Sequence, residues 1–258
     1  MLIDVNAWVG HWPFKRLHGN TCEGLLARMK EYGTDVSLVT NLNGIFYKNT
    51  QSANEELYEE VHSKKAYKDR FIPFAVINPI YGGWKDDFEV CVKKLGMKGI
   101  RVFPNYHDYS ITEPALLELV KMARDSNIPV ALTMRMVDER QRSWMDLATE
   151  WAIKDYLPLL QAVPDAKYML LNLSTGVALS AEEEALLKKT DVLFDTSGRH
   201  IGHLAKFAQR FGEERFAFGT HFPVLDYYTG LLRIDSLRAE EGDKEQYRCR
   251  NAQRFLGL

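Results

Sequence analysis

The chain has 258 residues, of which 46% are hydrophobic and 26% charged, an ordinary balance for a globular protein. Its formal net charge is −2 and it has no lysine- or arginine-rich run, so nucleic acid is not expected as a partner. The chain is about as long as one α/β barrel, which needs neither a disulfide framework nor a structural metal to bury its core.

The sequence also argues against secretion and membrane insertion. Its three cysteines, Cys22, Cys91 and Cys249, include no CxxC pair, and their odd number argues against a disulfide framework. The first residues resemble a strand and not a signal peptide. No apolar run approaches the roughly 18 residues that span a bilayer. We therefore expect a cytoplasmic protein with no membrane partner.

Short strand-forming runs alternate with helical patterns along the whole chain. Strands are expected near residues 2–8, 35–41, 71–78, 97–104, 128–135, 168–173, 191–196 and 215–221. Helices are expected near residues 21–32, 53–67, 84–95, 113–126, 148–162, 180–188, 200–211 and 243–256. This alternation is typical of parallel β-α units, and eight strands without a glycine-rich phosphate loop favour a closed barrel over an open sheet. We predict an α/β protein made of a single (β/α)8 TIM barrel over residues 1–258.

Polar residues stand at the ends of most predicted strands. Barrel enzymes keep their sites at the carboxyl-terminal end of the strands, and alternate side chains along a strand point into the barrel. The inward set that contains the polar residues is Asn6, Trp8, Asn41, Asn78, Arg101, Thr133, Arg135, Asn172, Asp195, Ser197 and His221. Polar residues also gather at strand ends because loops follow, so a barrel without a site remains the alternative.

Several of these segments resemble the amidohydrolase-2 (amidohydrolase-related) family of metal-dependent hydrolase barrels. Residues 3–8 (IDVNAW) are similar to the first strand of that family, apolar-Asp-x-His-x-His. Residues 98–104 (KGIRVFP) are similar to its fourth strand, and residues 218–223 (FGTHFP) resemble the eighth, Phe-Gly-Ser/Thr-Asp-x-Pro. Similarity to the fifth and sixth strands and to the final helix extends over residues 128–133, 168–174 and 251–258. The resemblance implies a barrel hydrolase.

The resemblance does not carry over the metal ligands. In the family, four histidines and one aspartate hold the metal and its water. The matching positions here are Asn6, Trp8, Thr133, Asn172 and His221. Amide and hydroxyl oxygens are weak ligands for divalent transition metals, and indole is not a ligand. We therefore expect no metal and no cofactor. A zinc site rebuilt from His11, His107 and His221 is the less favoured alternative.

His221, Arg101 and Arg135 are the predicted catalytic residues. His221 lies where the family has the aspartate that takes a proton from the attacking water, and an imidazole with a pKa of about 6.5 could act as that base. A guanidinium group binds a carboxylate or a developing oxyanion through paired hydrogen bonds. Structural ion pairing of these arginines with Asp195, Asp138 or Glu139 is the alternative.

The predicted substrate-binding residues are Asn6, Trp8, Thr133, Asn172, Asp195, His11 and His107. The charged segment 138–144 is interpreted as either a lid or a solvated loop. His200 and His203 have HxxH spacing but lack the glutamate of a metalloprotease motif, and are interpreted as ordinary helix residues.

These observations favour a hydrolase that attacks a small acidic lactone, ester or amide with water and without a metal; within the resemblance, lactonases are the nearest precedent. The first alternative is a ligand-binding barrel that has lost catalysis. The second is a metal-dependent hydrolase or decarboxylase with relocated ligands. The predicted partner is a small-molecule substrate, and a homo-oligomer stays open.

Overall fold

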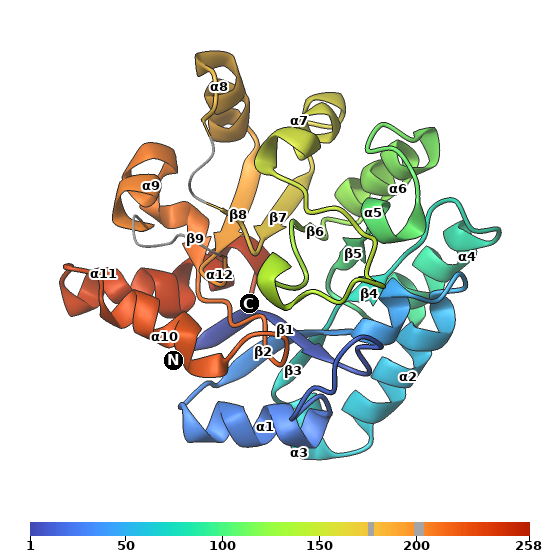
Figure 1. Ribbon diagram of the computed structural model, residues 1–258, viewed down its shortest axis with the longest axis horizontal. Coiled ribbons are helices and arrows are strands. Elements are labelled where there is room, and N and C mark those ends of the chain that lie inside the picture. The colour runs from blue at the N-terminus through green and yellow to red at the C-terminus, as the bar shows by residue number, and fades with distance from the viewer. Residues whose placement is uncertain (175–177, 199–203) are drawn as a thin grey trace.

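A closed ring of parallel strands lies at the centre of the computed structural model, which describes residues 1–174, 178–198 and 204–258 (Figure 1). The strands are β1 Ile3–Val9, β2 Val36–Asn41, β3 Phe71–Pro73, β4 Ala75–Val76, β5 Ile100–Val102, β6 Val130–Thr133, β7 Lys167–Leu171, β8 Asp191–Asp195 and β9 Phe216–Ala217. Strands β3 and β4 are separated only by Phe74 and fill one position of the ring.

Backbone hydrogen bonds close the ring between its two hydrogen-bonded sheets, β1–β2–β3 and β4 to β9. The Phe74 N–H donates to the Val39 carbonyl over 2.9 Å, which joins the third strand position to β2. The Val5 N–H donates to the Phe218 carbonyl over 2.9 Å, which joins β1 to the end of β9. The predicted TIM barrel is confirmed.

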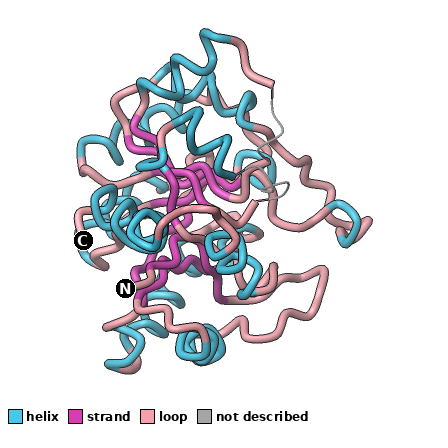
Figure 2. Tube along the Cα trace, turned by 90° about the vertical axis from the view of Figure 1, so that its left-hand side faces the viewer, coloured by secondary structure: helices cyan, strands magenta, loops and turns pink. Residues whose placement is uncertain are grey.

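Helices surround this ring, with the strands gathered in the middle of the molecule (Figure 2). They are α1 Cys22–Glu31, α2 Gln51–His62, α3 Lys65–Lys68, α4 Trp84–Glu89, α5 Pro104–His107, α6 Pro114–Asp125, α7 Ile153–Ala162, α8 Ala181–Lys189, α9 Leu204–Phe211, α10 Tyr227–Asp235, α11 Glu241–Glu245 and α12 Asn251–Leu256. Side-chain caps fix several starts: the Thr21 side chain accepts from the Gly24 N–H at α1. No helix in these described ranges has the length and apolarity to cross a membrane.

Three helical segments differ from the sequence prediction. The expected helix 53–67 is interrupted between α2 and α3, and the expected helix 148–162 begins only at Ile153. Helix α10 was not predicted. Its Gly230 is required by packing, because a Cβ there would lie 2.7 Å from the Gly219 carbonyl oxygen. Because glycine lowers helix propensity, the local sequence alone does not predict α10.

The hydrophobic core has three parts along the barrel axis and around it. Apolar side chains such as Ile3 and Phe74 fill the lower barrel, and Phe255 of α12 closes that end. A larger layer lies between the strands and the outer helices. A third cluster, which includes Trp8, Trp12 and Met136, lies over the carboxyl-terminal end of the strands. The candidate site is between the first and third parts.

Candidate functional site

An irregularity in β1 turns its last residues into the barrel. The register between β1 and β2 shifts between Asp4 and Ala7, as at a β-bulge. Val5 lies in the apolar core of the lower barrel, whereas Asn6 and Trp8 contact polar side chains above it. A bulge re-aims side chains in this way, and here it brings Asn6 and Trp8 to the barrel mouth.

Asn6 is the hub of the buried polar cluster. Its Oδ1 accepts from Arg101 Nη1 over 3.0 Å, and its Nδ2 donates to Asp195 Oδ2 over 2.7 Å. A guanidinium can only donate and a carboxylate can only accept, so these two partners fix which end of the Asn6 amide faces each of them. The amide therefore separates a buried cation from a buried anion.

Asp195 is fully buried and joins three strand ends. Besides Asn6, it accepts from the Ser197 hydroxyl over 2.5 Å and from the Asn172 backbone N–H over 2.7 Å. Burial raises the pKa of Asp195, while these hydrogen bonds and the charge of Arg101 oppose the rise. Its carboxylate thereby holds the turn after β7, where Asn172 has a φ of 53°.

Arg101 lies inside the barrel with no exposed surface. Its guanidinium stacks 4.0 Å from the centre of the Trp8 ring, and Nη1 also approaches Thr133 Oγ1 at 3.4 Å. Nε and Nη2 have no hydrogen-bond partner within the described ranges. Burial lowers the pKa of Arg101 to about 9, partly offset by the charges of Asp195 and Asp4.

Both ring nitrogens of His221 are engaged, and the side chain is fully buried. Nε2 lies 2.8 Å from the Met136 carbonyl oxygen, so it must carry the proton. Nδ1 is then the acceptor for the Trp8 Nε1–H over 3.2 Å. Burial lowers the pKa of His221 to about 3, assisted by the positive charges of Arg101 and Arg135. In this conformation the imidazole is neutral and its lone pair does not reach solvent.

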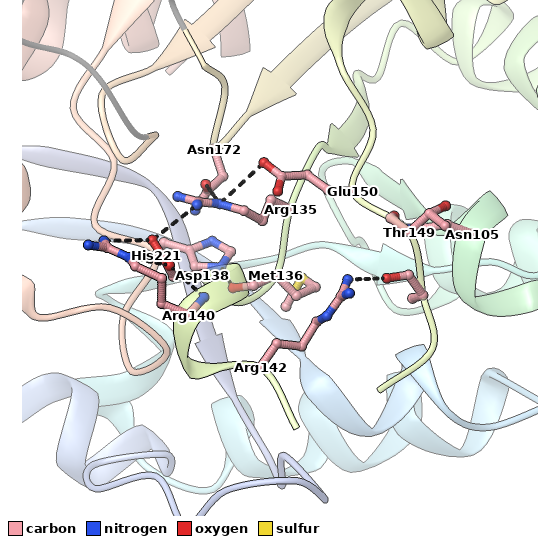
Figure 3. Close-up of polar contacts among 11 residues, drawn as sticks. Asn105, Arg135, Met136, Asp138, Arg140, Arg142, Thr149, Glu150, Asn172 and His221 are labelled. Atoms are coloured by element: carbon pink, nitrogen blue, oxygen red, sulfur yellow. Dashed lines mark hydrogen bonds and ion pairs between the residues drawn. The ribbon is translucent and has the colours of Figure 1, made fainter. Parts of the chain in front are cut away.

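An apolar roof seals the barrel axis. It consists of the buried side chains Trp8, Trp12, Leu42, Ile45, Val76, Phe103 and Met136. The loop after β6, residues 134–152, supplies Met136 and is fastened at its far end: Asn105 Nδ2 donates to the Thr149 carbonyl, and Arg142 Nη1 to the Ala148 carbonyl (Figure 3). The charged segment 138–144 is part of this loop, and we call residues 134–152 the lid loop.

The structure brings seven of the ten predicted site residues into one buried cluster: Asn6, Trp8, Arg101, Thr133, Asn172, Asp195 and His221. It does not bring His11 or His107 there. His11 is exposed, and its backbone N–H donates to Asn43 Oδ1. His107 donates from Nε2 to the Gly44 carbonyl, and burial lowers its pKa to about 4. The roles of all ten residues stay predictions.

Arg135 lies at the edge of this cluster, under the lid loop, and is 6% exposed. It donates to Asn172 Oδ1 over 3.4 Å and to Asp138 Oδ2 over 3.3 Å, and its Nε lies 3.8 Å from Glu150 Oε1 (Figure 3). Asp138 Oδ1 also accepts a hydrogen bond from Arg140 Nε over 2.9 Å. The hydrogen bonds from Arg140, with the charges of both arginines, hold the pKa of Asp138 well below its usual range. The structural ion pairing considered from sequence therefore exists for Arg135, through Asp138.

A cavity of about 630 Å³ opens beside the sealed axis. Its walls are formed by Arg135, Asp138, Glu139, Arg140, Gly198, Leu225, Asp226, Thr229 and Arg233. Gly198 lies so close to the preceding loop that a Cβ would be 1.7 Å from the Leu173 carbonyl oxygen. Sequence reasoning missed the contribution of α10 and the loop before it, because this helix was not predicted.

Arg233 of α10 lines this cavity and was not predicted from the sequence. Its Nη1 donates to the Thr196 carbonyl over 2.6 Å, and the side chain is half-buried. Burial lowers the pKa of Arg233; the charge of Asp195 opposes this, and that of Arg135 adds to it. No carboxylate in the described part of the chain is within ion-pair distance of Arg233. His200 and His203 lie outside the described residues.

Solved structures with the same barrel include enzymes that act on aromatic acids. A Staphylococcus aureus protein described as an amidohydrolase is 17% identical with a TM-score of 0.78, over 100% of this chain and 99% of that one. A 2,6-dihydroxybenzoate decarboxylase complexed with 2,6-dihydroxybenzoate is 16% identical with a TM-score of 0.76, over 100% and 98%. At these identities the likeness establishes the fold. No curated protein sequence matches the chain.

A third structure corrects the expectation that no cofactor is used. The 5-carboxyvanillate decarboxylase of Novosphingobium aromaticivorans, 15% identical with a TM-score of 0.75 over 100% of this chain and 96% of that one, is complexed with manganese and 4-hydroxy-3-methoxy-5-nitrobenzoic acid. Barrels of this kind thus include manganese-containing enzymes. The prediction of no cofactor was therefore wrong, because it took the loss of the family's ligand pattern as the loss of every metal.

The residues of the buried cluster do not themselves fit a divalent metal. In the described ranges, no three histidine, cysteine, aspartate or glutamate side chains come together as a metal-binding group. The zinc site imagined from His11, His107 and His221 is therefore not formed. Asp195 is already the acceptor for three hydrogen bonds, and the Arg101 guanidinium lies among the same side chains.

Family membership rests on a match along almost the whole chain. The amidohydrolase family model matches residues 9–258. The match begins at the last residue of β1, after Asn6 and Trp8, and includes the strand ends that carry Arg101, Asp195 and His221. The chain therefore belongs to the amidohydrolase family.

Proposed function

We propose that the chain is an enzyme that acts on a small carboxylic acid and anchors the carboxylate between Arg135 and Arg233. One observation carries this proposal: two guanidinium groups, Arg135 buried and Arg233 half-buried, face one cavity at the carboxyl-terminal end of the strands. Barrel enzymes have their sites at this end, and guanidinium groups bind carboxylates through paired hydrogen bonds.

Electrostatics supports an anion at this point. The charge of Arg135 lowers the pKa of Arg233, so the two cations are close enough to repel each other. Asp138 and Glu150 each offset part of the charge of Arg135, and Asp138 is itself shared with Arg140. A carboxylate bound between the two arginines would remove the repulsion, and partial burial would strengthen its attraction to both.

The anchoring mode favours hydrolysis over decarboxylation. An ion-paired carboxylate is stabilised in the ground state, and this stabilisation would have to be lost before carbon dioxide could leave. The arginines would instead hold one end of the substrate while water attacks a lactone, ester or amide carbonyl elsewhere. His221 and Arg101 remain the predicted catalytic pair, but they become reachable only if the lid loop moves Met136 and Trp8 is displaced.

A second function, acid binding without turnover, is favoured by a different observation. The His221 imidazole has a pKa of about 3, donates to the Met136 carbonyl and accepts from Trp8, so it is not available to water under the closed roof. If the roof does not open, the off-axis cavity would act as a binding site alone.

The proposal is tested by binding and turnover of small acids. A panel of aromatic and aliphatic carboxylic acids, with their lactones and amides, is screened by calorimetry and by product analysis. Arg233→Ala should weaken acid binding at least tenfold, because a half-buried charge-assisted hydrogen bond is lost. Lys121→Ala removes an exposed cation of α6 and serves as the control. Equal binding by the wild type and Arg233→Ala would refute the anchor; binding without any product would select the second function.

A further inference from the structure

A second cavity lies beside the first and has a different character. Its volume is about 450 Å³, and its walls are Lys15, Arg16, Leu17, His18, Arg28, Tyr32, Gln141, Phe222, Pro223, Val224, Leu225, Asp226 and Tyr227. The cationic side chains come from the loop after β1 and from α1, whereas Asp226 is the carboxylate in this set. We call it the basic cavity, and the cavity of Arg135 and Arg233 the anchor cavity.

The two cavities adjoin along two shared boundaries. Leu225 and Asp226 line both of them. On the lid loop, Arg140 faces the anchor cavity and the next residue, Gln141, faces the basic cavity. Lys15 Nζ reaches Gln141 Oε1 at 3.4 Å, so the lid loop and the loop after β1 meet above this boundary. The two cavities therefore share part of their walls.

One wall of the basic cavity consists of closely packed aromatic side chains. The Tyr32 ring stacks on Tyr227 with 5.3 Å between ring centres and 9° between planes, and Tyr227 also packs against Phe222 at 5.5 Å. Tyr227 is buried and donates from its hydroxyl to Thr34 Oγ1 over 2.7 Å. These contacts hold one wall in place and give the cavity an apolar surface next to its charged rim.

Positive charge is in excess on that rim. Arg28 is paired with Glu31 at 2.5 Å, which offsets its charge. Lys15 and Arg16 are exposed, and neither has a carboxylate within ion-pair distance in the described part of the chain. The protein as a whole carries a net charge of −2, so this excess is local and would attract an anionic group.

We propose that the two cavities form one groove, and that the substrate is an elongated acid with a second anionic group. The first carboxylate lies between Arg135 and Arg233, the apolar middle passes Leu225, and the second anion lies near Lys15 and Arg16. This inference rests on the proposed function, because it takes the anchor cavity as the carboxylate site and adds the class of substrate.

The test compares α,ω-dicarboxylates from succinate to sebacate with monocarboxylates of the same chain length, by calorimetry at low salt. Beyond a minimum length, the dicarboxylate should bind about three- to tenfold more tightly than its monocarboxylate, the range of two exposed ion pairs. The double variant Lys15→Ala/Arg16→Ala should lose this preference and keep monocarboxylate binding. High salt should also remove it.

A matched control removes two exposed cations elsewhere. Lys65→Ala/Lys68→Ala makes the same charge change on α3, which leads into β3 and so lies at the opposite end of the barrel. It should keep the preference for dicarboxylates. If monocarboxylates and dicarboxylates of every length bind equally, or if both double variants behave alike, the single groove is refuted while the anchor stands. If no acid binds the wild type, the proposed function itself fails.

Discussion

Arg101 on the barrel axis and Arg233 on the wall of the anchor cavity show how differently one residue type is used in two regions of this barrel. Arg101 is fully buried on the axis, stacks on Trp8 and holds the Asn6 amide. Arg233 lies on a cavity wall, half-buried, with its backbone acceptor at Thr196 and no carboxylate partner in the described ranges. The axis is built as polar core, whereas Arg233 on the off-axis cavity is partly exposed and has no ion pair within the described ranges.

The largest expected effect separates these two arginines. Arg101→Ala should destabilise the protein by about 3–5 kcal/mol, because Asp195 would stay buried without its nearby cation and Asn6 Oδ1 would lose its donor. Arg233→Ala should leave the free energy of unfolding within about 1 kcal/mol, because Arg233 has no ion pair in the described ranges and is partly exposed to solvent. Urea unfolding measures both. Similar losses in the two variants would mean that Arg233 is structural and would remove the contrast.

The buried ionisable groups on the barrel axis should make the free energy of unfolding depend on pH. The pKa of His221 is lowered from its usual 6.5 to about 3, so its contribution to stability is complete above pH 6.5 and is lost as the pH falls toward 3. Burial raises the pKa of Asp4 to about 6, so Asp4 acts in the opposite direction and favours the folded state as the pH falls below 6.

Comparison with His221→Gln isolates the histidine. Between pH 7 and pH 4.5 the wild type should lose about 3 kcal/mol of stability relative to this variant. The lower pH is about two units below the pKa of an unfolded histidine, and each unit corresponds to about 1.4 kcal/mol. Asp4 contributes equally to both proteins and cancels. Parallel pH profiles would indicate that the ring is solvated and that the roof is open in solution.

A smaller effect, on acid binding, is expected from Asp138, the lid-loop residue that contacts Arg135. Asp138→Ala removes the carboxylate that Arg135 and Arg140 share, so a bound acid no longer competes with it. Acid binding should tighten about three- to tenfold. Asp138→Asn keeps the size of the side chain and should act in the same direction. Weaker binding in both would show that Asp138 positions Arg135 for the ligand and does not compete with it.

The smallest effect is expected at the outer surface of the lid loop. Trp144 is 86% exposed, whereas Trp8 is fully buried under the roof. Trp144→Ala should change the free energy of unfolding by less than about 0.5 kcal/mol and leave acid binding unchanged. A change of several fold in acid affinity would instead mean that this indole folds onto the ligand.

The sequence predicted the barrel and most of the buried cluster, because both follow from regular strands. Alternation along strands correctly placed Arg101, Asp195 and His221 together at the carboxyl-terminal end. It did not predict that Trp12 and Met136 seal the axis, since these residues lie on loops without periodicity. It also missed Arg233, because α10 contains Gly230 for packing and its local preference for helix is weak.

Position 198 limits how this protein can change its ligand preference. Only a hydrogen atom fits there, since any larger group would overlap the Leu173 carbonyl oxygen. That part of the anchor cavity is therefore main chain, and mutation cannot reshape it without moving two loops. New specificities, whether evolved or engineered, would have to arise where side chains line the cavity, such as Leu225 and Thr229 on the α10 side or Glu139 of the lid loop.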